Sequence, residues 1–212
     1  MHLSKPPLIF YLSALAYIAT LHLTPYPGDF VLKALPALSL AFWVWRSPDS
    51  RVRLALIAAL LLSALGDILL AFIPRGSDTF VAGLSAFLIA HLLFSMAFLR
   101  APNRQPRPVY LIVFIVLLSA TTAGLLVPKL GSMAGPVLVY SAIITLMTIA
   151  SVRYGQLMAM AGALTFMVSD SLIAFNTFVL ADPALSVRYL IMLTYYAALF
   201  LITHSLSATK RH

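Results

Sequence analysis

The sequence predicts an all-α integral membrane protein, a bundle of eight transmembrane helices with both termini cytoplasmic, in which residues 1–212 form a single polytopic membrane domain. The 212 residues are 62% hydrophobic and only 9% charged, and their mean hydropathy is +0.99, whereas a soluble domain carries about 25% charged residues. The apolar residues form long segments, and most basic residues lie in alternate connections between these segments. The first observation predicts membrane-spanning helices and the second predicts their orientation.

Eight apolar segments are expected to form the helices, since a spanning helix needs about 20 residues. The second segment is the weakest candidate because it is short and contains Lys33 and Pro36. Short connections rich in Pro, Gly and Asp join the segments, so consecutive helices are expected to be antiparallel. The segments are Leu8–Thr24, Phe30–Trp45, Val52–Ile73, Phe80–Leu99, Val109–Val127, Met133–Val152, Leu157–Leu180 and Tyr189–Ala208.

The basic residues predict the topology. Along eight spans, ten Lys and Arg fall on one side of the membrane and three on the other, which are Arg75, Lys129 and Arg188. By the positive-inside rule, both termini are cytoplasmic, and we expect a multi-pass protein of the bacterial inner membrane. The net charge of +8 is then a topology signal, and no nucleic-acid partner is expected. The A-x-A pattern at residues 14–16 leaves a cleaved signal peptide as an alternative, but the charge pattern needs the first helix retained.

Two acidic residues, Asp67 and Asp170, lie deep in apolar sequence on the third and seventh segments. Both belong to an Asp-x-Leu-Leu/Ile-Ala-Phe motif, whereas the other four Asp lie in short polar breaks and the chain has no Glu. A carboxylate inside a membrane helix costs about 2.5–3.5 kcal/mol on insertion scales, so we predict that the pair is functional. The similar motifs indicate either two parallel four-helix halves or coincidence.

Counting 1.5 Å per residue from the cytoplasmic ends places both carboxyl groups roughly 20–25 Å into the membrane. Other polar side chains fall at a similar depth, and His91 lies nearer the middle, so a single buried site is predicted. The alternatives are structural: Asp as a hydrogen-bonding contact between helices, Lys33 extended toward the interface, and Tyr in an aromatic belt. The residues at this depth are Lys33, Tyr140, Asn176, Tyr195 and Tyr196.

The residue types favour acid–base chemistry by a carboxyl pair. One neutral and one ionised carboxyl, the latter beside Lys33, would resemble the pair that cleaves acetal bonds. The absence of Cys and of a G-x-S-x-G motif argues against a Cys nucleophile and gives no support for a Ser nucleophile. The two intramembrane His lack zinc-site spacing, so no metal is expected, although Asp67, Asp170 and His91 could in principle form a site. A proton-coupled transporter using the Asp pair and Lys33 is the main alternative, and a structural membrane protein is the third.

Several short motifs, in order along the chain, resemble those of one family. They are Lys33-x-Leu35-Pro36, Gly66-Asp67-x-x-Leu70, Gly83-x-x-x-Phe87-x-x-x-His91-x-x-Phe94, Tyr140-Ser141, Gly162-x-x-x-Phe166-x-x-Ser169-Asp170 and Tyr195-Tyr196-x-Ala198. From the second segment to the eighth, the chain resembles the YhhN family, whose animal relatives are the transmembrane-86 lysoplasmalogenases.

This resemblance implies an eight-helix membrane hydrolase that cleaves the vinyl ether bond of lysoplasmalogens, or of a related lysolipid. The products would be a fatty aldehyde and glycerophospho-ethanolamine or -choline, and no cofactor is expected. The partners would be the lysophospholipid substrate and the bilayer, and the resemblance leaves the oligomeric state open. We expect Asp67 and Asp170 to be catalytic. The expected substrate-binding or supporting residues are Lys33, His91, Tyr140, Ser169, Asn176, Tyr195 and Tyr196.

Overall fold

The computed structural model describes residues 6–47, 50, 52–72, 78–102, 107–180, 182 and 184–207. Within these residues the protein is all-helical, with no strand, which confirms the predicted all-α class. Two short 3₁₀ turns, Leu21–Leu23 and Gly131–Met133, continue the first and fifth α-helices. The α-helices are α1 (Leu8–Thr20), α2 (Asp29–Arg46), α3 (Arg53–Ala71), α4 (Asp78–Arg100), α5 (Val109–Leu130), α6 (Ala134–Tyr154), α7 (Leu157–Phe178) and α8 (Leu185–Ser207).

Each apolar segment corresponds to one of these helices, with one informative difference at α8. The predicted segment began at Tyr189, but the helix begins at Leu185 and includes Arg188. A charged residue interrupts an apolar run without interrupting a helix here, because Arg188 lies in the first helical turn and its side chain donates a hydrogen bond to the Thr24 hydroxyl.

Five stretches of the described residues are long and apolar enough to cross a membrane. They are α3, most of α4, the stretch Val109–Tyr154 that contains α5 and α6, α7 and α8. The helix α1 is shorter, and α2 carries Asp29, Lys33 and Arg46 within its 18 residues. The length and apolar composition of these helices indicate a multi-pass membrane protein. The count of eight spans stays a prediction.

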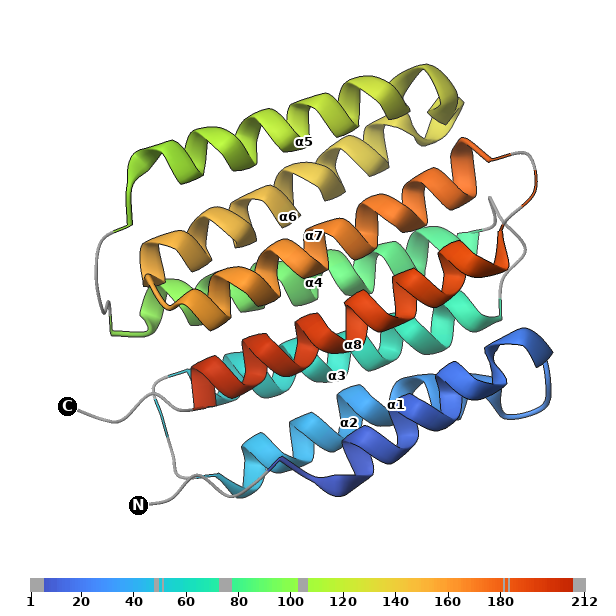
Figure 1. The fold of residues 1–212 in the computed structure, drawn as a ribbon, viewed down its shortest axis with the longest axis horizontal. Coiled ribbons are helices and arrows are strands. Elements are labelled where there is room, and N and C mark those ends of the chain that lie inside the picture. Colours follow the sequence, from blue (N-terminus) through green and yellow to red (C-terminus); the bar gives the residue numbers. More distant parts are fainter. Residues whose placement is uncertain are drawn as a thin grey trace.

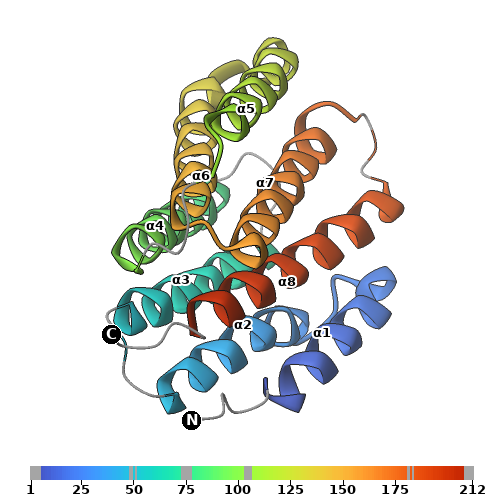
Figure 2. The same cartoon turned by 60° about the vertical axis from the view of Figure 1, so that its left-hand side comes forward.

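Consecutive helices run in alternating directions, so the start of α1 and the end of α8 lie at the same end of the bundle (Figure 1). The helices α1 and α2 lie at one edge and α5 at the other, with α3, α4, α7 and α8 between them (Figure 2). Buried apolar residues from all eight helices form one continuous cluster. Two distant parts of the sequence are thereby packed together at the centre, where α8 contacts both α2 and α3.

The basic side chains of the described residues gather at the end of the bundle where α1 starts, which we call the basic end. Arg46 and Arg100 end their helices there, Arg153 lies in the last turn of α6, and Arg53 begins α3. The opposite end, called here the far end, carries Lys129 at the end of α5 and Arg188 at the start of α8. The cytoplasmic assignment of the basic end stays a prediction that rests on the positive-inside rule.

The outer surface of α5 has the character of a lipid-facing helix. Phe114, Leu117 and Leu125 are more than half exposed, whereas Ile115 and Leu126 face the other helices. A helix that is apolar on both its inner and outer faces suits a hydrocarbon environment rather than water.

The helices α7 and α8 approach closely at Gly162. A Cβ atom at this position would lie 2.9 Å from both Leu201 Cβ and Ile202 Cγ1, and 3.0 Å from the Ile202 backbone nitrogen. Small residues let membrane helices approach to backbone contact, and the absence of a side chain at Gly162 therefore sets the α7–α8 distance.

We expect Gly162→Ala to lower the free energy of unfolding by about 1–3 kcal/mol, because overpacking a close contact forces the backbones apart. The measurement is thermal unfolding of the purified protein in detergent. Gly124→Ala is the matched control, since no atom lies within 4 Å of the corresponding Cβ position in α5. Equal melting temperatures for the two variants would contradict this account of the packing.

Candidate active site

A cavity of about 450 Å³ lies between α2, α3, α7 and α8 toward the far end of the bundle. Both intramembrane carboxyl groups, Asp67 and Asp170, line it. Three other side chains that the sequence singled out line the same cavity: Lys33, Asn176 and Tyr195. The structure thus brings residues from four helices, separated widely in sequence, to one space.

Asp67 is 2% exposed and takes a partner on each carboxyl oxygen. The Lys33 Nζ lies 3.7 Å from Oδ1, and the Tyr195 hydroxyl donates a hydrogen bond of 2.7 Å to Oδ2. A buried charge needs an opposite charge and hydrogen bonds to offset its desolvation. Asp67 has both, so its surroundings suit a carboxylate.

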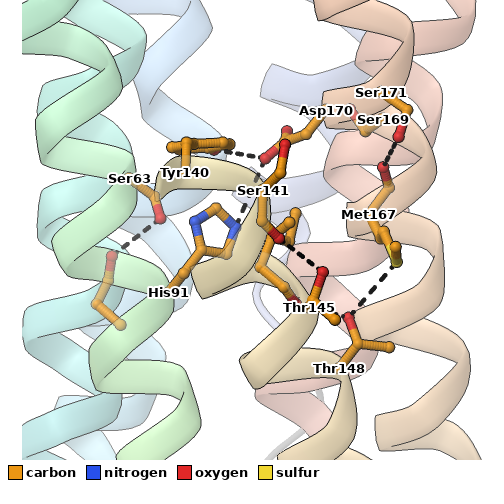
Figure 3. Close-up of polar contacts among 12 residues, drawn as sticks. Ser63, His91, Tyr140, Ser141, Thr145, Thr148, Met167, Ser169, Asp170 and Ser171 are labelled. Carbon is orange, nitrogen blue, oxygen red and sulfur yellow. Dashed lines mark hydrogen bonds and ion pairs between the residues drawn. The ribbon is translucent and has the colours of Figure 1, made fainter. Parts of the chain in front are cut away.

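Asp170 has a different set of partners. The Tyr140 hydroxyl donates a hydrogen bond of 2.5 Å to Oδ2, and the His91 Nε2 lies 3.7 Å from the same oxygen (Figure 3). The fully buried His91 ring packs edge-on against Tyr140 and Phe166. Among the described residues, no Lys or Arg pairs with Asp170.

The partners of the two carboxyl groups come from helices in corresponding positions along the chain. Asp67 on α3 takes Lys33 from the preceding helix, α2, and Tyr195 from α8. Asp170 on α7 takes Tyr140 from the preceding helix, α6, and His91 from α4. We call α1–α4 and α5–α8 the two halves of the chain. Each carboxyl group has one partner from its own half and one from the last helix of the other half, which is α8 for Asp67 and α4 for Asp170.

Three further side chains from the predicted set bond to backbone groups instead of to either carboxyl group. The Tyr196 hydroxyl donates to the Lys33 carbonyl at 2.9 Å, and the Ser169 hydroxyl donates to the Ile191 carbonyl at 3.0 Å. The Asn176 Oδ1 accepts a hydrogen bond of 3.1 Å from the Ala184 amide. The first two contacts join α8 to α2 and to α7, and the third joins α7 to the residue that precedes α8.

The cavity also contains charged residues that the sequence analysis did not select. Asp29 and Arg188 line it, together with Tyr17 of α1. Their positions in or next to short connections led us to interpret Arg188 as a topology signal and Asp29 as part of a polar break. One signal could have identified Asp29, because residues four apart on a helix share a face, and Lys33 was already a candidate.

A second, smaller cavity of about 60 Å³ adjoins the first. The two share Asp170 and four apolar residues, and Tyr140 lines only the second. Most of the second lining is apolar and comes from α4, α5, α6 and α7. Asp170 thus stands where a space lined by charged groups meets a mainly apolar one. Among the described residues, no group of three His, Asp or Glu is arranged to hold a metal ion.

Comparison with known proteins gives matches over most of the chain. The YhhN family model matches residues 28–206. A lysoplasmalogenase of Mycobacterium bovis is 39% identical over 178 residues, which cover 81% of this chain and 67% of the relative. The human lysoplasmalogenase TMEM86B is 37% identical over 177 residues, covering 82% of this chain and 74% of the relative. No solved structure matches the chain significantly.

Proposed function

We propose that this protein, which belongs to the YhhN family, is a lysoplasmalogenase-like hydrolase that cleaves the vinyl ether bond of a lysophospholipid within the membrane. The names of its relatives support the reaction class. The observation that carries the proposal is the pair of carboxyl groups on one cavity, Asp67 buried and Asp170 half-buried, with unlike partners. Acid–base catalysis by two carboxyl groups requires such a difference in their surroundings.

In this proposal Asp170 is the proton donor. Hydrolysis of a vinyl ether begins with a proton transfer to the β-carbon, which gives an oxocarbenium ion. Tyr140 and His91 both face Oδ2 of Asp170, which leaves Oδ1 to carry the proton toward the substrate. Among the residues that the structure describes, Asp170 also has no Lys or Arg partner, which suits a carboxyl group that must be neutral at the start of the reaction.

Asp67 acts as the carboxylate in the same reaction. Lys33 and Tyr195 stabilise its negative charge, and this charge stabilises the oxocarbenium ion, as in the carboxyl pairs of glycosidases. Asp67 then accepts a proton from the water that adds to the cation. In the resulting hemiacetal the bond from carbon to the glycerol oxygen breaks, and this oxygen takes the proton from Asp67. The hemiacetal hydroxyl returns a proton to Asp170, so that a fatty aldehyde is released and both carboxyl groups regain their starting states.

The two adjoining cavities differ in polarity, and this difference would orient the bound lipid. The charged cavity would hold the glycerol and headgroup, and the apolar cavity would hold the first carbons of the alkenyl chain. Asp170 lines both cavities, which supports a position of its carboxyl group beside the vinyl ether bond of a lipid bound in this way.

The test is aldehyde release from lysoplasmenylethanolamine by the purified protein in detergent, beside the corresponding ester lysolipid. We expect aldehyde from the vinyl ether and no fatty acid from the ester. A protein that releases no aldehyde, but couples solute uptake to a proton gradient in vesicles, would be a transporter and would overturn the proposal.

The neighbouring tyrosines of α8 offer a matched pair of variants. We expect Tyr195→Phe to lower kcat roughly 10–100-fold, because it removes a hydrogen bond to a charged group worth about 1.5–3 kcal/mol. Tyr196→Phe removes the bond to the Lys33 carbonyl, so a smaller loss of kcat is expected. The measurement is kcat and KM for both; equal losses would argue against a direct role of Tyr195 at Asp67.

A further inference from the structure

Two charged residues of the large cavity have no part in the proposed proton transfers. Arg188 lies in the first turn of α8, is half-buried, and donates a hydrogen bond to the Thr24 hydroxyl. Asp29 lies one helical turn before Lys33 on α2 and is 8% exposed. Both line the cavity toward the far end of the bundle. An arginine and an aspartate on one cavity are complementary to a ligand that carries one negative and one positive charge.

We infer that Arg188 binds the phosphate of a lysophospholipid headgroup in this cavity, with Asp29 facing its ammonium group. The inference deepens the proposed function and rests on it for the identity of the lipid. Lys33 is a poorer candidate for the phosphate, because it already pairs with Asp67 at 3.7 Å. The guanidinium has five N–H donors in a planar fork that suits a phosphate, and the bond to the neutral Thr24 hydroxyl leaves others for a ligand.

The spacing along α8 fits such a lipid. Arg188 precedes Tyr195 by seven residues, which is about 10 Å along a helix, and Tyr195 marks the level of Asp67. In a lysoplasmalogen, the phosphorus and the β-carbon of the vinyl ether are separated by seven bonds, or roughly 8 Å at the reach per bond of an extended chain. A phosphate held by Arg188 therefore places the vinyl ether at the level of the carboxyl pair.

The experiment measures binding, so that it does not depend on turnover. The probes are 1-O-hexadecyl-glycerophosphoethanolamine, whose saturated ether cannot react in the proposed way, and 1-O-hexadecylglycerol, which lacks the phosphate and the amine. Full-length protein in nanodiscs is titrated with each lipid, for wild type, Arg188→Gln and Arg188→Lys. Lys129→Gln is the matched control, because Lys129 is an exposed cation at the same end of the bundle and does not line the cavity.

We expect wild type to bind the phospholipid more tightly than the alkylglycerol. Arg188→Gln should weaken phospholipid binding roughly 10–100-fold, the range for lost hydrogen bonds to a charged group, and leave alkylglycerol binding unchanged. Arg188→Lys should lose less, and Lys129→Gln should match wild type. Inorganic phosphate that competes as strongly as the phospholipid would identify a simple anion site and overturn the headgroup assignment.

Two other results would also overturn the inference. Equal weakening of both lipids in Arg188→Gln would show that Arg188 acts through its contact with Thr24. Wild type with no preference for the phospholipid would show that the cavity does not recognise the headgroup. A failure of the proposed hydrolase would look different, since it would abolish aldehyde release and leave the phosphate-dependent binding in place.

Discussion

Replacement of either cavity carboxyl group, Asp67 or Asp170, by an amide of the same size is expected to lower the rate of aldehyde release by about 10²–10⁴-fold, the range for loss of a general acid or base. The Asp67→Asn variant loses the charge that stabilises the cation and activates water. The Asp170→Asn variant loses the proton donor. Because asparagine has nearly the same shape, the helix packing around both positions should persist.

The measurement is kcat for each variant, beside a melting curve that establishes folding. Asp182→Asn is the control, because it makes the same substitution at an exposed aspartate in the α7–α8 connection and should keep the wild-type rate. Folded Asp67→Asn and Asp170→Asn proteins that both stay within threefold of wild type would refute the carboxyl-pair mechanism. That result would leave the two carboxyl groups as structural contacts between helices.

The second large effect is expected at Lys33. Removing one partner of a buried ion pair leaves an uncompensated charge and destabilises a protein by about 3–5 kcal/mol. We expect Lys33→Gln to show this loss, because Asp67 would keep only the Tyr195 hydroxyl as its partner. Its rate of aldehyde release should also fall at least tenfold, since the carboxylate form of Asp67 would be disfavoured.

A double variant separates these two effects. Lys33→Gln combined with Asp67→Asn removes both charges, so it should unfold at a higher temperature than Lys33→Gln alone while remaining inactive. The measurement is a double-mutant cycle on the free energy of unfolding in detergent. A zero coupling energy would mean that the 3.7 Å approach of Lys33 and Asp67 contributes nothing to stability.

The helical class and the approximate helix bounds could be predicted from the sequence, because long apolar runs allow few structures other than helices in a membrane. The ends of the helices were harder to predict where the apolar run and the helix end at different residues. Arg188 interrupts the apolar run yet lies inside α8, and Leu21–Leu23 tightens to a 3₁₀ turn within the predicted segment Leu8–Thr24.

Depth along the helices grouped Lys33, Asp67, Asp170 and Tyr195 at one level, and the structure places all four on one cavity. Depth does not determine the rotation of a helix about its axis, however. It could not predict that Tyr195 would face Asp67 while Tyr196 bonds to the Lys33 backbone. The sequence also could not predict that each carboxyl group has a partner from the other half of the chain, because this depends on which helices are neighbours in space.

The two partners of Asp67 are synthesised at very different times. Lys33 is made just before α3, whereas Tyr195 follows Asp67 by 128 residues. At about 5–20 residues per second, the ribosome needs roughly 6–25 seconds to reach Tyr195. During this interval Lys33 is the only one of the two partners available, and α2 and α3 are close neighbours in the fold. The ion pair between Lys33 and Asp67 thus lets the Asp67 carboxylate find an opposite charge within the α2–α3 hairpin, before the last helix arrives to complete the site.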